Sequence, residues 1–420
     1  MEEQLSFLNG LAFTSLWFLV FVIPLENVMI PGVGLLGVVV GMIASGICVL
    51  AIIERGRVRP LSAGHVLMGS FVLWATVSYL WTLDPHGTLV QVPVYLRLLF
   101  MVWLIWQVAA EGGQPIRLLQ AYVLGTCAAG LDTIYQFVHQ NEFAYLRYAG
   151  AGSNPDDLGL MVALSVPISY CFFLRSEGRV RWLYGAQLVL AGTTILLSGS
   201  RGATVAVVVA LSIVPATAAC LKPRQIVAIS LTTVLIIAAA FFVAPASSRE
   251  RLSTIPHELV GGDLSGRTQV WAAGVELFEE HPFLGVGSGA YLNSAKPNVV
   301  VTNVAHNTFL SVVVELGIIG LAIFCALLAF LLVSATELPW LSKRLWLVCL
   351  AVWLVGVLGL SWEIRKPTWL FFGLLLAQHG SVREKVRMLR PHVLEDLRTR
   401  QQVFEMDCPR NLSSRSLQLN

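Results

Sequence analysis

The stretch HNTFLSVVVELGIIGLAIFCALLAFLLV, residues 306–333, decides the fold class. Glu315 is the only carboxylate in it, and the rest is almost wholly apolar. A helix needs about 20 apolar residues to cross the hydrocarbon core of a bilayer, so this stretch is long enough to span a membrane. The whole chain is similar in character, since 56% of its 420 residues are hydrophobic and 13% are charged. So little polar surface cannot solvate a globular exterior, and we expect lipid to be the solvent.

Eleven further apolar runs meet or approach the same length. They cover residues 8–25, 32–53, 65–83, 90–110, 117–138, 157–175, 181–198, 202–220, 226–245, 344–361 and 367–380. The last run is short enough to need helix tilt or local thinning of the bilayer. The sequence therefore predicts an all-α polytopic membrane protein with about twelve transmembrane helices. We divide it into helices 1–9 (1–245), a polar loop with an amphipathic helix (246–305), helices 10–12 (306–380) and a tail (381–420).

The positions of Lys and Arg predict the orientation. Loops on one side of the predicted bundle hold 11 of them, and the tail after residue 380 adds eight. The short loops on the other side hold only Arg147, Arg201, Arg365 and Lys366. Cytoplasmic loops retain positive charge, so both termini should be cytoplasmic and the 246–305 loop periplasmic. The tail has apolar residues at helical spacing, and a solvated cytoplasmic extension explains it better than a specific lipid or partner site.

Composition also argues against several functional classes. A net charge of +3 does not suggest nucleic-acid binding. Six of the seven cysteines lie in apolar segments without paired spacing, which indicates neither disulfides nor a metal site. We expect no cofactor.

Arg201 is the first unusual residue on the predicted outer face. It lies in Leu197-Ser198-Gly199-Ser200-Arg201-Gly202-Ala203, a turn so short that the guanidinium must sit at the membrane boundary. An arginine beside open backbone amides at a helix N-terminus favours an anion such as phosphate. An interfacial arginine that reaches lipid headgroups would give the same pattern, and position alone does not separate the two.

Arg267 lies in the long loop, where Ser265-Gly266-Arg267 precedes apolar residues at helical spacing. The spacing predicts a short amphipathic helix on the bundle, with Ser265 as N-cap, that ends before Pro282. Taken alone, Arg267 would be an ordinary solvated charge. The glycine-rich stretch 284–291 that follows is better explained as a tight connector than as a phosphate loop.

His306 lies at the outer mouth of the predicted tenth helix. An imidazole titrates near neutrality and could take a proton from a sugar hydroxyl that attacks an activated carbon. A lone interfacial histidine is more often structural, so both interpretations stay open. Glu315 should not orient it, because nine residues at roughly 100° each place Glu315 on the opposite face and about 13 Å deeper.

These motifs in order resemble the O-antigen ligase and polymerase superfamily. The pattern is a short-turn Ser200-Arg201-Gly202, Gly266-Arg267 with Trp271, Pro282-x-x-Gly285-x-Gly287, and His306-Asn307-x-x-Leu310. The match covers roughly residues 190–325. Upstream, residues 152–159 look like the start of that family's sixth helix, and residues 81–85 resemble a turn in its N-terminal half.

The resemblance implies a metal-independent, inverting, glycosyltransferase-C-like enzyme of the bacterial inner membrane, with its active site on the periplasmic face. Its donor would be a glycan on undecaprenyl diphosphate, and its acceptor a glycan or lipid A-core. Arg201 and Arg267 would bind the diphosphate, and His306 would activate the acceptor hydroxyl. Ser200, Asn307, Arg97 and Tyr291 are further substrate-binding candidates, although Arg97 could instead pair within the bundle.

Two alternatives remain open at this point. A repeat-unit polymerase shares the same motifs, and we favour a ligase only slightly. A transporter or flippase of lipid-linked sugar would also have twelve helices and outward arginines. A transporter is expected to have related halves and charged residues near the bilayer midplane, whereas here the polar chemistry gathers on one face.

Overall fold

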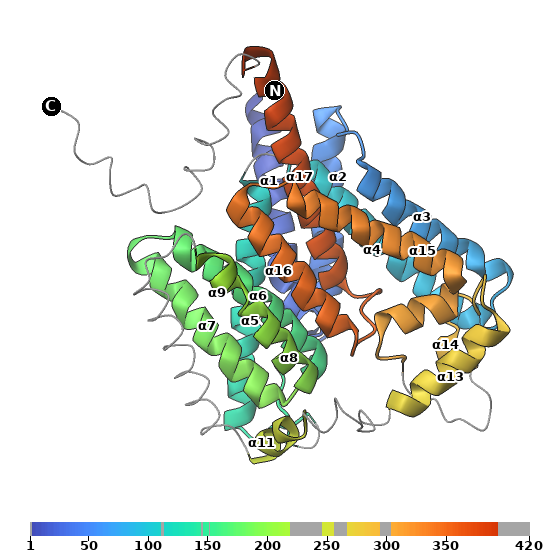
Figure 1. Ribbon diagram of the computed structural model, residues 1–420. Coiled ribbons are helices and arrows are strands. Elements are labelled where there is room, and N and C mark those ends of the chain that lie inside the picture. The colour runs from blue at the N-terminus through green and yellow to red at the C-terminus, as the bar shows by residue number, and fades with distance from the viewer. Residues whose placement is uncertain are drawn as a thin grey trace.

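The computed structural model describes residues 2–110, 113–143, 146–150, 152–218, 246–255, 267–294 and 304–393. Within these ranges the protein is almost entirely helical (Figure 1). The strands that are described form one short antiparallel hairpin, β1 (Met29–Ile30) and β2 (Gly34–Leu35). The structure is therefore that of an all-α membrane protein, as the sequence predicts.

The helices follow the apolar runs along the chain. The first part contains α1 (Glu2–Val22), η1 (Ile23–Leu25), α2 (Leu36–Arg55), α3 (Ala63–Val77), η2 (Ser78–Leu80), α4 (Pro85–Val108), α5 (Gln114–Val138) and α6 (Pro155–Arg175). The second part contains α7 (Gly178–Ser198), α8 (Arg201–Ala210), α9 (Ile213–Ala216), α11 (Ala246–Ser253), α13 (Arg267–Glu280), α14 (Tyr291–Ser294), α15 (Thr308–Thr336), α16 (Trp340–Val357) and α17 (Lys366–Val393).

Eight spans in the described ranges are long and apolar enough to cross a membrane. They are Ser6–Leu25, Leu36–Arg55, Ala63–Leu80, Pro85–Val108, Pro155–Arg175, Gly178–Ser198, Thr308–Thr336 and Trp340–Val357. Each coincides with a run that the sequence singles out. The count of about twelve stays a prediction.

The other four predicted spans have different outcomes. The run 117–138 forms α5, a helix of 25 residues that is not among the eight most apolar spans. The run 202–220 forms the shorter apolar helix Arg201–Ala216, and 226–245 lies outside the described residues. The run 367–380 continues into the tail as α17, because Ser381 and the charged residues after it contain no helix breaker before Pro391.

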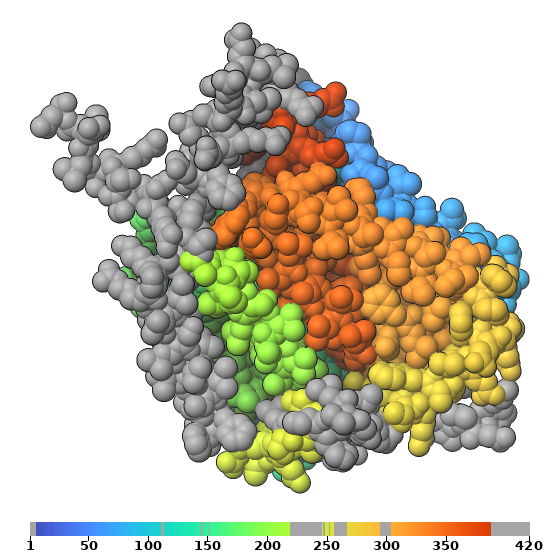
Figure 2. Space-filling view, viewed as in Figure 1, coloured from blue at the N-terminus to red at the C-terminus, as the bar shows by residue number. Residues whose placement is uncertain are grey.

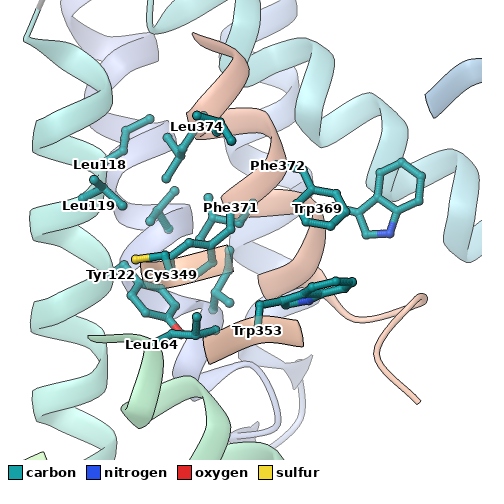
Figure 3. Packing of buried hydrophobic residues seen from close by; sticks show 14 of the residues in the cluster. Leu118, Leu119, Tyr122, Leu164, Cys349, Trp353, Trp369, Phe371, Phe372 and Leu374 are labelled. Atoms are coloured by element: carbon teal, nitrogen blue, oxygen red, sulfur yellow. The ribbon is translucent and has the colours of Figure 1, made fainter. Parts of the chain in front are cut away.

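Buried residues of helices α5, α6, α16 and α17, several of them aromatic, pack against one another in the hydrophobic core (Figure 3). Tyr122 of α5 packs edge-on against Phe371 of α17 and donates its hydroxyl to the Met161 carbonyl of α6 at 2.8 Å. Trp353 of α16 donates to Thr368 of α17 at 2.9 Å. Among the eight spans, α6 has the largest buried share.

Helix α15 is broken at Gly317, whose φ of 66° and ψ of −172° are not helical. The break exposes backbone groups that a continuous helix would pair internally, and such groups must find partners in a membrane protein. The glycine-rich stretch 284–291, Pro282 just before it and Trp74 of α3 supply such partners. Four hydrogen bonds of 2.9 Å do so: Val286 N to Val314 O, Gly287 N to Glu315 O, Ile318 N to Pro282 O, and Trp74 Nε1 to Leu316 O. This stretch is a tight connector, as expected.

The helices of the long polar segment gather at one end of the molecule. Helices α11, α13 and α14 lie at the bottom of Figure 1, whereas the N-terminus lies at the top, near the far end of α17. The segment that carries Arg267 and the turn before α8 therefore belong to the same end of the bundle.

Candidate functional site

The turn between α7 and α8 consists of two residues. Gly199 ends α7 in the left-handed conformation with a φ of 56°, which glycine adopts without strain. Ser200 caps α8, and its hydroxyl accepts a hydrogen bond from Ala203 N at 3.3 Å. Arg201 is thus the first residue of α8, beside that helix's free amides, and its Nη1 donates to Thr254 Oγ1 at 3.0 Å. The short turn and the helix N-terminus are those that the sequence predicts.

The first turn of α6 lies directly beside this turn. Asn154 caps α6 by accepting from Asp156 N at 2.8 Å. A Cβ atom at Gly159 would lie 2.5 Å from the Ala203 Cβ, so glycine is needed for the close approach of α6 and α8. The Asp156 carboxylate pairs with Arg147 Nη2 at 2.8 Å and also interacts with the Ser200 hydroxyl.

Helix α13 begins at Arg267 and is tied to the segment before α15. Trp271 donates its indole N–H to the Ala305 carbonyl at 2.8 Å, next to His306 in the chain. The expected N-cap, Ser265, lies outside the described residues. The Arg267 guanidinium reaches the turn after α16, where a Cβ atom at Gly359 would lie 3.0 Å from Arg267 Nη1.

His306 has a left-handed backbone with a φ of 48°. This conformation is uncommon outside glycine and concentrates at functional sites, where surrounding structure holds it. The next residue, Asn307, caps α15 by accepting from Phe309 N at 3.0 Å and Leu310 N at 3.1 Å. The half-buried imidazole is therefore attached to a well-anchored helix start.

The turn between α16 and α17 joins α6 to α15. Trp362 donates its indole N–H to Asp157 Oδ1 at 2.7 Å, and its backbone N–H to Thr308 Oγ1 at 2.8 Å. Arg365 Nη2 pairs with Asp157 Oδ2 at 3.1 Å. Through Trp362, the acidic first turn of α6 is fixed relative to the residues that follow His306.

The charges that act on His306 come from several of these segments. Burial lowers the pKa of His306, and the positive charge of Arg267 lowers it further. The carboxylates of Asp156 and Asp157 act on the same imidazole in the opposite direction. Charges from α6 and α13 thus act on one ring. Asp156 interacts with both Arg267 and the hydroxyl of Ser200, so it links the two predicted arginine motifs.

In the space-filling view, the yellow-green α11 and the yellow α13 lie along one edge of the molecule (Figure 2). The green surface of α8 lies between α11 and the orange-red surface of α16, in agreement with the packing of α8 against both.

Three of the predicted substrate-binding residues have other contacts. Arg97 is exposed in the middle of α4, and its Nε donates to the Pro93 carbonyl of the same helix at 3.1 Å. Tyr291 is buried and donates its hydroxyl to the Val270 carbonyl of α13 at 2.6 Å. Asn307 uses its side-chain oxygen as a helix cap. Ser200 also caps its helix and is buried, but it precedes Arg201 and its hydroxyl interacts with Asp156.

The acidic pair Asp156 and Asp157 is absent from our set of predicted site residues. The stretch 152–159 that contains it does resemble the start of the family's sixth helix, but acidic residues in a helix's first turn are common and favoured by the helix dipole. Trp362 is absent for a similar reason, because nothing in the sequence ties residue 362 to residue 157.

The O-antigen ligase family model matches residues 186–325. This match and two curated relatives support the O-antigen ligase and polymerase superfamily. It is similar to an O-antigen ligase of Pseudomonas aeruginosa, with 23% identity over 347 residues that cover 79% of this chain and 76% of the relative. It is also similar to the exopolysaccharide production protein ExoQ of Rhizobium meliloti, with 27% identity over 317 residues that cover 68% of each chain.

The similarity to the O-antigen ligase superfamily agrees with the structure at a coarse level. The protein is an integral membrane protein with several apolar helices, and its family points to the biosynthesis of surface polysaccharides. The matched residues include Arg201, Arg267 and His306, whereas Asp156, Asp157 and Trp362 lie outside them.

Proposed function

We propose that this protein transfers a glycan from undecaprenyl diphosphate to a sugar hydroxyl at the periplasmic face of the inner membrane. One observation carries the proposal: Trp271 of α13 binds the Ala305 carbonyl at 2.8 Å, so the helix that begins with Arg267 is attached beside His306. Asp156 extends the group to the turn of Ser200 and Arg201. Permanent cations and a titratable ring are the groups that such a transfer needs.

The two arginines would bind the donor diphosphate. A guanidinium is always charged and offers paired N–H donors that match phosphate oxygens. Arg201 stands at the N-terminus of α8 and Arg267 at that of α13, where helix dipoles also favour an anion. As the bond between the anomeric carbon and the phosphate oxygen breaks, the leaving diphosphate gains charge that these groups would offset. We expect this charge to make a divalent metal unnecessary, so transfer should survive excess EDTA.

His306 would act as the general base. In its neutral form it would accept the proton of the acceptor hydroxyl while that oxygen forms its bond to the anomeric carbon from the face opposite the diphosphate. A direct displacement of this kind inverts the anomeric centre. Burial and Arg267 lower the pKa of His306, which keeps the imidazole neutral and ready at physiological pH.

The supporting roles follow from position. Ser200 would contribute to phosphate binding, because it precedes Arg201 at the N-terminus of α8. Asn307 would act indirectly, by capping the helix that carries His306. The contacts of Tyr291 favour a role in holding α13. Arg97 would contribute only through an exposed site on α4, where its side chain points toward the start of that helix.

The decisive test replaces Arg201, Arg267 and His306 singly by alanine. Each variant would be checked for membrane expression and then assayed for transfer of polyprenyl-diphosphate-linked glycan in reconstituted vesicles. We expect a loss of about 100-fold or more for each, as for removal of a group that stabilises developing charge. Arg383→Ala, on the exposed face of α17, is the control and should leave transfer unchanged. Unchanged transfer by all three site variants would defeat the proposal.

A ligase is our preferred form of this function, ahead of a polymerase. The two relatives leave both open, since one is named as an O-antigen ligase and the other as an exopolysaccharide production protein. A deletion strain distinguishes them by its products. Loss of a ligase leaves long chains on the carrier lipid, whereas loss of a polymerase leaves acceptors capped with single repeat units.

A further inference from the structure

We propose that Asp156 and Asp157 are positioning residues that fix the site around His306 and stabilise its protonated form while the acceptor oxygen attacks. This inference rests on the proposed transfer reaction and extends it to the start of α6. Neither residue lies in the part of the chain that the family model matches.

Asp157 is held by two donors. Its Oδ1 accepts from Trp362 Nε1 at 2.7 Å, and its Oδ2 pairs with Arg365 at 3.1 Å. The same tryptophan donates its backbone N–H to Thr308, two residues after His306 in the chain. Trp362 is fully buried, so this connection is rigid. Asp157 therefore maintains the position of α6 relative to the segment that carries the imidazole.

Asp156 makes the corresponding connection on the arginine side. It pairs with Arg147 at 2.8 Å, and Arg147 Nε donates to the Ser198 carbonyl at 2.8 Å, at the end of α7. Asp156 also interacts with Ser200 and with Arg267. The two adjacent carboxylates thus face different halves of the site, one toward the turn before Arg201 and the other toward the turn that supports His306.

The charges that act on His306 come from two helices. Arg267 of α13 opposes protonation of the ring, and Asp156 and Asp157 of α6 favour it. The two carboxylates are themselves partly compensated by Arg147 and Arg365. Both carboxylates lie in the first turn of α6, where the helix dipole favours negative charge. Without them, an imidazolium would face the Arg267 cation alone, and His306 would be a weaker base.

The proton affinity of His306 can be measured without any glycan. Diethyl pyrocarbonate reacts with neutral imidazole, so its rate at the His306 peptide, followed by mass spectrometry across pH, reports the protonation of this residue among the eight histidines. The proteins compared would be the wild type, Asp156→Asn, Asp157→Asn and Arg365→Gln in lipid nanodiscs. Asp157→Asn keeps an oxygen to accept from Trp362, so the fold should survive.

We expect the pH of half-maximal modification to fall by about one unit in each aspartate variant, the size of effect that a nearby charge produces. It should rise in Arg365→Gln, because the Asp157 charge is then less compensated. Asp84→Asn is the matched control, since Asp84 is also an acidic residue at the start of a helix, α4, but is not among the charges acting on His306. It should leave the half-maximal pH unchanged.

Glycan transfer by the same proteins separates the two hypotheses. The inference predicts that the acid limb of the transfer rate shifts with the modification curve, and that the maximal rate falls about tenfold in the aspartate variants. Reduced transfer at every pH with no shift in either curve would mean a merely structural acidic pair and would overturn the inference. Shifted modification curves in a protein that transfers no glycan would support the charge coupling and reject the proposed function.

Discussion

His306 combines a left-handed backbone with a site where one cation and two anions act on its ring. Its lowered pKa sets the sign of the pH dependence. Below that pKa the imidazole holds a proton and cannot accept another, so transfer should fall in acid. The midpoint of the fall should lie below the usual histidine pKa of about 6.5, and transfer should reach a plateau toward neutral pH. Folding also favours the neutral imidazole, so the contribution of His306 to the stability of the folded protein is lost as the pH falls. Rates of glycan transfer in vesicles between pH 5 and 8 would check the predicted loss of transfer in acid.

The variant Arg267→Gln provides a second test of the role of His306. Removing this cation should raise the pKa of His306 and move the acid limb of transfer to higher pH, because Arg267 opposes protonation of the ring. The maximal rate should also fall, because the variant loses a predicted phosphate ligand. An acid limb that stays in place would show that Arg267 and His306 do not share a site.

At this scale the sequence identifies which residues are unusual but not which of them meet. Arg201 and His306 are conspicuous because charges and histidines are scarce in apolar surroundings, whereas Arg267 stands out only as part of the ordered motifs. Asp157 and Trp362 are ordinary by themselves, and their 2.7 Å hydrogen bond joins residues 205 positions apart. Tyr291 lies near the motifs in the sequence, but its hydroxyl donates a hydrogen bond to the backbone of α13.

Helix α13 offers a test of how an element places the site. Trp271→Phe keeps the ring but removes the hydrogen bond to Ala305, which contributes about 1 kcal/mol to stability. We expect a small decrease in the melting temperature but a loss of transfer of about tenfold, because the helix of Arg267 loses its link to the His306 segment. Trp182→Phe, at an exposed position on α7, should change neither quantity. Equal transfer by both variants would contradict the role of this contact.

The glycine-rich stretch 284–291, which binds α15, allows a prediction about the stability of the protein. Gly287 has a φ of 103°, and a Cβ atom there would lie 2.1 Å from Thr82 Oγ1. Gly287→Ala should therefore destabilise the protein by about 2 kcal/mol or more, from backbone strain together with the clash. Gly46→Ala is the control, because Gly46 lies in a helix with no heavy atom within 4 Å of its Cβ position. Thermal unfolding in detergent, followed by size-exclusion chromatography, would compare them.

The break in α15 could not be predicted from its sequence. Gly317 lies inside an apolar run that is typical of a continuous helix, and a single glycine is tolerated there. The break is stable because a loop more than 25 residues earlier in the chain binds the freed groups, for example Val286 N at Val314 O. Local signals such as the cap at Ser200 and the turn at Gly199 were predictable, because they depend only on neighbouring residues.

At the scale of the whole molecule, the membrane class follows directly from composition, whereas the number of spans does not. Helix α5 has the length of a span but carries Arg117 and Asp132, so its apolar character is weaker. The polar end of α17 continues its apolar part without a break. Burial in the bundle, which hydropathy does not report, decides where such helices lie.

Buried carboxyl groups bear on the transporter alternative. Glu315 and Glu363 are both buried in the bundle. Glu315 accepts from Gly289 N and Gln91 Nε2, both at 2.8 Å, and Glu363 accepts from Ser311 at 2.7 Å. Gly289 belongs to the long segment at one end of the molecule, so these acids lie toward that end. Their position fits polar chemistry gathered on one face better than a site at the membrane midplane.

The orientation of the molecule is the remaining prediction at this scale. The charge distribution predicts that α11 and the end of α17 lie on opposite sides of the membrane. In a variant without native cysteines, Ser253→Cys at the end of α11 should react with a membrane-impermeant maleimide added to cells whose outer membrane has been permeabilised. Lys385→Cys on α17 should react only after the inner membrane is opened. Both positions are exposed, so side-chain burial does not limit labelling. The reverse pattern would put Arg201, Arg267 and His306 on the cytoplasmic side, where a periplasmic transferase could not use them.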